Sequence, residues 1–120
     1  MRQPLEENHL LDAQRRPAGG STIGRGLIIN WQEGPLAVDG ERRDPNGCFV
    51  ETVIAAALGR LRFYQTDGSG WQEDGKLKVL GTFACHENDM AITKLEEALH
   101  WLDHRTRERE RRGVEGTHTP

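Results

Sequence analysis

The clearest pattern of apolar and polar positions lies toward the C-terminal end of the chain. Between residues 88 and 112, apolar residues recur every three or four positions, which is the repeat of an amphipathic helix. Asn88 suits the start of this helix as a cap, and Gly113 suits its end. The pattern therefore predicts a long helix over residues 88–112. Its apolar face consists of Ile92, Leu95, Leu99, Leu102 and Thr106.

The same helix carries a second stripe that is separate from this face. At ~100° per residue, Trp101 lies about 120° round from Leu95, and Met90, Lys94 and Arg105 lie within ~40° of Trp101. A single helix has only one core face to satisfy. An aromatic ring flanked by two cations therefore indicates contact with a ligand or with another subunit.

An earlier helix is predicted over residues 47–65, where Asp44-Pro45 or Asn46 supplies the start signal. Gly59 weakens this helix by ~1 kcal/mol relative to alanine, which suggests a close approach to its backbone. Arg60 lies on the flank of the apolar face. That face is formed by Val50, Val53, Ile54, Ala57, Leu61 and Tyr64.

The rest of the chain predicts short strands and turns. Residues 25–31 alternate as a strand does, residues 35–38 form a second short strand, and Asp39-Gly40 is a turn signal. Residues 66–83 indicate a β-hairpin with Trp71 on its first arm.

These elements predict an α+β fold, with a small antiparallel sheet packed against an antiparallel two-helix hairpin that forms a homo-oligomer. One domain is expected over residues 22–113. A flexible arm at residues 1–21 would precede it, since this segment lacks periodicity and ends in Gly-Gly, and a tail at residues 114–120 would follow.

Composition narrows the classes of function. The 120 residues include 16 basic and 19 acidic side chains, for a net charge of −3, which argues against bulk nucleic-acid binding. No apolar run approaches the ~20 residues that span a bilayer, and residues 1–20 contain no signal-peptide core. We therefore expect a cytoplasmic protein whose two cysteines, Cys48 and Cys85, are reduced thiols.

Metal binding is disfavoured by spacing. His100 and His104 stand four residues apart, as zinc ligands on a helix do, while Cys85 and His86 stand before the helix. Twelve helical residues between Asn88 and His100 rise ~18 Å, too far for one chain to supply ligands to one ion from both places. The sequence predicts neither a metal site nor a cofactor.

Catalysis is also disfavoured. Neither cysteine lies in a nucleophile motif, and the glycine-rich stretches lack the pattern of a phosphate-binding loop. Binding of an anion together with an aromatic group is better supported, because arginine matches phosphate geometry and aromatic rings stack on bases. The candidate ligand-binding residues are Arg60, Tyr64, Lys94, Trp101, Arg105 and Arg107.

Two segments resemble a known family. AITKLEEALHW, which starts at Ala91, and NGCFVETVIAAALGRLRFYQ, which starts at Asn46, look like the arms of the C-terminal helical hairpin of phage proteins. Those proteins act as sponges against cyclic-nucleotide immune signalling in bacteria (the CBASS and Thoeris systems). The resemblance covers chiefly residues 46–65 and 86–113. Residues 25–38 are similar to the β portion of the branch aimed at glycocyclic ADP-ribose.

The resemblance implies stoichiometric binding without chemistry. It predicts that a cyclic oligonucleotide or a cyclic ADP-ribose isomer is enclosed at subunit boundaries of a homo-oligomer, often a hexamer, in the cytoplasm of the bacterial host. A phage or prophage structural or protein-interaction module, which would use the second stripe to bind a partner protein, is the alternative.

Overall fold

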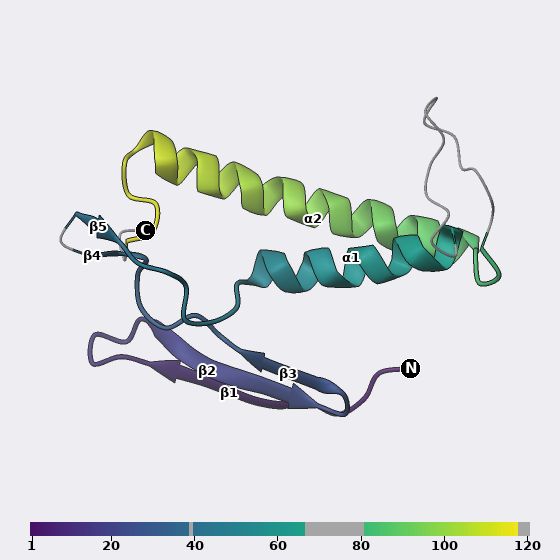
Figure 1. Cartoon of the computed structure of the whole chain (residues 1–120), viewed down its shortest axis with the longest axis horizontal. Coiled ribbons are helices and arrows are strands. Elements are labelled where there is room, and N and C mark those ends of the chain that lie inside the picture. Colours follow the sequence, from purple (N-terminus) through teal and green to yellow (C-terminus); the bar gives the residue numbers. More distant parts are fainter. Residues whose placement is uncertain (39, 67–80, 118–120) are drawn as a thin grey trace. The chain divides into compact units, whose positions relative to one another are not determined.

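A computed structural model describes residues 1–38, 40–66 and 81–117 of the chain (Figure 1). The chain divides into two compact units. One unit joins Met1–Phe49 to Arg105–Pro120, and the other is Val50–His104. The α+β class is confirmed, because one unit contains a small antiparallel sheet and two helices follow it in the sequence. The expected single domain over residues 22–113 differs from this division.

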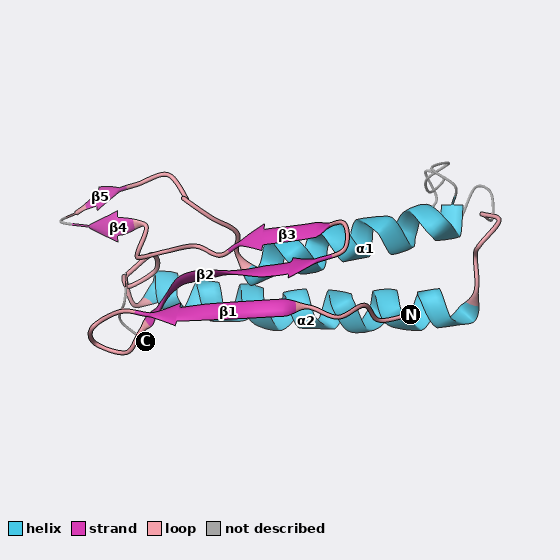
Figure 2. Cartoon of the chain, turned by 90° about the horizontal axis from the view of Figure 1, so that it is seen from below, coloured by secondary structure: helices cyan, strands magenta, loops and turns pink. Residues whose placement is uncertain are grey.

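A three-stranded antiparallel sheet lies in the first unit (Figure 2). Its strands are β1 (Glu6–Leu11), β2 (Pro17–Gly24) and β3 (Leu27–Asn30), in the order β1-β2-β3. Thr22 pairs with Ile29 across β2 and β3, and both are buried. The strand predicted over residues 25–31 is confirmed by β3.

The expected arm over residues 1–21 is wrong, because β1 and most of β2 occupy this segment. Asp12 organises the turn between them: its carboxylate accepts hydrogen bonds from the backbone N–H groups of Gln14 and Arg16, each at 2.9 Å. The Arg16 backbone bond, followed by the Arg16 and Gln14 contacts, lowers the pKa of Asp12. Gly20 lets the strands approach, since a Cβ there would collide with the carbonyl of Asn8.

A side-chain clasp, formed by Gln32 and Asn46, joins the end of the sheet to the segment before the first helix. The carboxamide of Asn46 pairs with the backbone of Glu33 in both directions: its Oδ1 accepts from Glu33 N at 2.8 Å and its Nδ2 donates to Glu33 O at 2.9 Å. Oε1 of Gln32 accepts from the backbone N–H groups of Asn46 and Gly47, at 2.9 and 3.2 Å. Asn46 therefore joins two backbone segments instead of starting a helix.

The second short strand is confirmed as β4 (Ala37–Val38), which pairs with β5 (Glu41–Arg42). Asp39 of the predicted turn lies outside the described residues. The chain after the last helix contacts β4, because Ala37 N–H donates to the carbonyl of Gly116 at 2.9 Å. Part of the predicted tail thus belongs to the first unit.

Two helices form the hairpin, α1 (Val50–Thr66) and α2 (His86–Arg111). Both predictions are confirmed within a few residues, and Gly113, with φ at 74°, follows the end of α2. The hairpin predicted over residues 66–83 falls mainly on residues 67–80, which lie outside the described residues.

The buried face of α1 is rotated from the predicted one. Leu58 and Gln65 are buried, whereas Val50 and Ala57, which the pattern placed in the core, are exposed. The other predicted positions, Val53, Ile54, Leu61 and Tyr64, are half-buried, so the buried side is shifted toward Leu58 and Gln65, which lie two turns apart on one side of the helix. On α2 the predicted division holds: the apolar face is half-buried, and Met90, Lys94, Trp101 and Arg105 are exposed.

The carboxamide of Gln65, only 6% exposed, closes the hairpin by binding the start of α2. Its Nε2 donates to the carbonyl of Cys85 at 3.0 Å and to Asp89 Oδ1 at 2.6 Å. Its Oε1 accepts from the N–H of Cys85 at 3.0 Å and from Asn88 Nδ2 at 3.2 Å. Both ends of one side chain are therefore satisfied by the opposite arm.

Replacing Gln65 by alanine should lower the free energy of unfolding by about 2–3 kcal/mol, because it leaves partly buried backbone groups of Cys85 unpaired. Urea denaturation at matched protein concentration measures this loss. Glu96→Ala is the control, since it removes an exposed ion pair worth less than about 1 kcal/mol. Equal losses for the two variants would contradict this role of Gln65.

Candidate functional site

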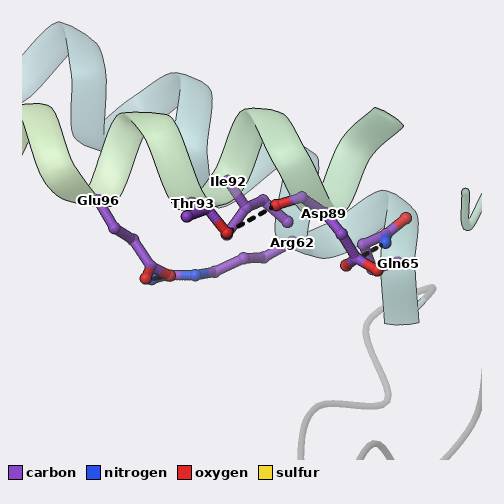
Figure 3. Close-up of a pocket in the computed structure, with 6 residues that line it drawn as sticks. All are labelled: Arg62, Gln65, Asp89, Ile92, Thr93 and Glu96. Carbon is purple, nitrogen blue, oxygen red and sulfur yellow. Dashed lines mark hydrogen bonds and ion pairs between the residues drawn. The ribbon is translucent and has the colours of Figure 1, made fainter. Parts of the chain in front are cut away.

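An open pocket of about 590 Å³ lies between the two helices (Figure 3). Arg62 spans it from α1 and pairs with Glu96 of α2, with 2.8 Å between Nη2 and Oε1. At the other end of the pocket, Asp89 Oδ1 accepts a hydrogen bond from Nε2 of Gln65. The lining residues are Arg62, Gln65, Asp89, Ile92, Thr93 and Glu96.

The charges of this pocket do not suit a phosphate. Two carboxylates, Asp89 and Glu96, stand against one guanidinium, that of Arg62, and the guanidinium already pairs with Glu96. An anion entering here would have to displace that carboxylate and would meet a second one. An anionic ligand therefore needs another surface of the hairpin.

Arg60 and Tyr64 belong to a cluster of one cation and several aromatic rings on α1. The guanidinium of Arg60 lies over the rings of Phe63 and Tyr64, 5.1 Å from each centroid, and its Nε donates to Tyr64 Oη at 3.3 Å. Phe83 meets Tyr64 edge to face, with 6.2 Å between centroids. Among the described residues, no carboxylate forms an ion pair with Arg60. The cluster therefore presents an exposed cation beside three aromatic rings, of which those of Phe63 and Phe83 are exposed and that of Tyr64 is half-buried.

Trp101 forms a second aromatic cluster on α2. It is 68% exposed, and the rings of His100 and His104 lie edge to face with it, each with a centroid distance of 6.0 Å. Lys94 lies nearer the start of α2, where its Nζ is 3.8 Å from Glu97 Oε2, and both side chains are largely exposed. Such a solvated pair holds its charges weakly, so Lys94 can turn to an incoming anion.

The six predicted site residues therefore fall in three places. The structure brings Arg60 and Tyr64 into direct contact on α1. Lys94 and Trp101 lie on the exposed side of α2, and Arg105 and Arg107 lie on the part of α2 that belongs to the first unit. Phe63 was missed by the sequence analysis, although its position three residues after Arg60 puts both on neighbouring parts of the helix surface.

Arg109, two residues after Arg107, binds groups of the same chain. Its Nε binds Glu115 at 3.0 Å, and its Nη2 donates to the carbonyls of Val114 and Thr117, both at 2.9 Å. With its side chain only 18% exposed, Arg109 ties the end of α2 to the chain that follows. It is therefore a structural residue and no candidate for the ligand.

Across the described ranges, no group of three or more His, Cys, Asp or Glu side chains is placed to hold a metal ion. Cys48 and Cys85 are free thiols, as expected. No described helix is long and apolar enough to cross a membrane.

Known proteins resemble this chain across the same elements. Residues 25–107 match the family model described as Acb2/Tad1, hairpin domain. This chain belongs to the Acb2/Tad1 hairpin family. It is also 44% identical over 95 residues to a protein named Thoeris anti-defense 1, from Bacillus phage SBSphiJ7. That alignment covers 79% of this chain and 54% of the relative, so the chain spans about half the length of the relative that it matches.

The family match confirms the resemblance drawn from the two helical segments. It starts just before β3 and runs through α1 into the last turns of α2, so it includes both arms of the hairpin. All six predicted site residues, from Arg60 to Arg107, lie inside it. Strands β1 and β2 both lie before the matched residues, and most of their length falls in the segment that was expected to be an arm.

Proposed function

We propose that this protein is a phage anti-defence protein that binds and sequesters a cyclic nucleotide immune messenger without cleaving it. The ligand is a cyclic oligonucleotide or a cyclic ADP-ribose isomer, and the protein acts in the cytoplasm of the bacterial host. The observation that carries this proposal is the Acb2/Tad1 hairpin match over residues 25–107, supported by the relative named for anti-defence against Thoeris.

The chemistry of the hairpin surface supports such a ligand. A cyclic nucleotide offers phosphates and flat rings, and the Arg60 cluster offers a guanidinium beside the rings of Tyr64 and Phe63. Arginine donates to phosphate oxygens with a planar fork, while an aromatic face stacks on a base. Trp101, with Lys94 on the same stripe, offers an aromatic ring and an ammonium group on α2.

Incomplete burial supports a homo-oligomer. The described residues include two buried hydrophobic side chains, Ile29 and Leu58, and α2 contributes none. Trp101, Met90, Phe63 and Val50 are exposed along the hairpin. We infer that copies of the chain, six if the family's expected hexamer holds, pack through these surfaces and bring ligand-binding residues of different subunits together.

Light scattering at micromolar concentration should show a species well above the 13.5 kDa of one chain. Trp101→Glu should shift it toward the monomer, because a buried contact would then contain an unpaired charge. His86→Glu, at the start of α2, is the matched control for added charge. A wild-type monomer, with or without nucleotide, would contradict the inter-subunit site.

Arg60→Ala and Arg105→Ala should each weaken ligand binding roughly ten- to a hundredfold, since a charge-assisted bond to phosphate contributes ~1.5–3 kcal/mol. Arg62→Ala is the control, because Arg62 lies on the same helix but pairs with Glu96. Calorimetric titration with cyclic dinucleotides, cyclic trinucleotides and cyclic ADP-ribose isomers measures these losses.

Equal losses for Arg60→Ala and Arg62→Ala would remove the Arg60 cluster from the site. If the wild-type protein bound none of these compounds, sequestration would be wrong. The exposed Trp101 stripe would then favour the second candidate, a phage or prophage module that binds a partner protein.

A further inference from the structure

The clasp of Gln32 and Asn46 contains a dipeptide with an intrinsic chemical weakness, Asn46-Gly47. A backbone nitrogen can attack the carboxamide carbon of the asparagine before it. Glycine allows this attack most readily, because it has no Cβ to hinder the approach and its backbone reaches many conformations. Asn46 is exposed, so water reaches the site.

The reaction needs only water. The N–H of Gly47 gives its proton to hydroxide, and the nitrogen forms a bond to Cγ of Asn46. The bond from Cγ to Nδ2 then breaks, and the amide nitrogen takes a proton from water, which regenerates hydroxide, and leaves as ammonia. Water next opens the resulting ring at either carbonyl, which leaves an aspartate or an isoaspartate in place of asparagine.

The fold nevertheless requires both residues. A Cβ on Gly47 would lie 2.5 Å from the carbonyl of Trp31, so no larger residue fits there without movement. Asn46 supplies a donor and an acceptor to the backbone of Glu33, which an aspartate could not do. The sequence thus keeps a labile pair because the clasp depends on it.

The closed clasp opposes each step of the attack. Gln32 Oε1 accepts the N–H of Gly47 at 3.2 Å, which holds the proton that must leave. Both polar atoms of the Asn46 carboxamide are held by the backbone of Glu33, at 2.8 and 2.9 Å, which restricts the rotation that the attack requires. The reaction therefore has to wait until the clasp opens.

We propose that Asn46 is a spontaneous deamidation site whose rate is controlled by the Gln32 side chain. Once formed, the new carboxylate places an oxygen against the carbonyl of Glu33, where Nδ2 donated before. An isoaspartate also adds a methylene to the main chain beside Gly47. Either product opens the clasp, including the backbone bridge between Trp31 and Cys48, and the change is irreversible.

Peptide mapping by mass spectrometry after incubation of the full chain at mildly alkaline pH tests this proposal. Native protein should deamidate at Asn46 far more slowly than protein in urea. Gln32→Ala should speed the native reaction by roughly ten- to a hundredfold, the factor expected for two lost hydrogen bonds, and should match the wild type in urea. Gln14→Ala, an exposed glutamine outside the clasp, is the control and should behave as the wild type.

A native Asn46 that deamidates as fast as in urea, or an unchanged rate in folded Gln32→Ala, would overturn the proposal. If Gln32→Ala does not fold, hydrogen exchange of the Gly47 amide in the wild-type protein provides a second test. The slowing of deamidation relative to urea should then equal the protection factor of the Gly47 amide within about threefold, because both need the same opening. Rapid deamidation of Asn46 in protein whose Gly47 amide is strongly protected from exchange would contradict the proposal.

Discussion

The hairpin depends on the carboxamide of Gln65, because its hydrogen bonds join the end of α1 to the start of α2. A side chain with one oxygen and one NH₂ group can satisfy a backbone N–H and a backbone carbonyl together, and here both belong to Cys85. This anchoring sets which side of each helix faces the other arm. It leaves Arg60 exposed and Tyr64 half-buried on α1, and Trp101 exposed on α2.

The helices then leave much of their apolar surface half-buried. The polar pocket between them carries two carboxylates and one arginine, so it does not compensate the charge of a phosphate. The cationic and aromatic groups point instead to surfaces that one chain does not enclose. Under the proposed function, packing copies of the chain together would bury this apolar surface and enclose the ligand, which is why we connect oligomerisation with sequestration.

The periodic parts of the chain were predictable, and the parts held by single polar contacts were not. The repeat from Ile92 to Thr106 identified α2 and its exposed stripe. By contrast, the turn made by Asp12 and the strand pairing at Gly20 leave no alternation in the sequence. The roles of Gln65 and Arg109 were not predicted, because the partners of Gln65 are distant in the sequence and those of Arg109 follow a helix end.

Recovery of intact ligand tests sequestration most directly. The purified protein is incubated with each cyclic nucleotide, separated from unbound compound, and heated to unfold it, and the released material is analysed by chromatography and mass spectrometry. The account predicts that one compound is removed from solution in a fixed ratio to the protein and returns unchanged on heating. Release of a cleaved product, or failure to remove any of the compounds from solution, would contradict it.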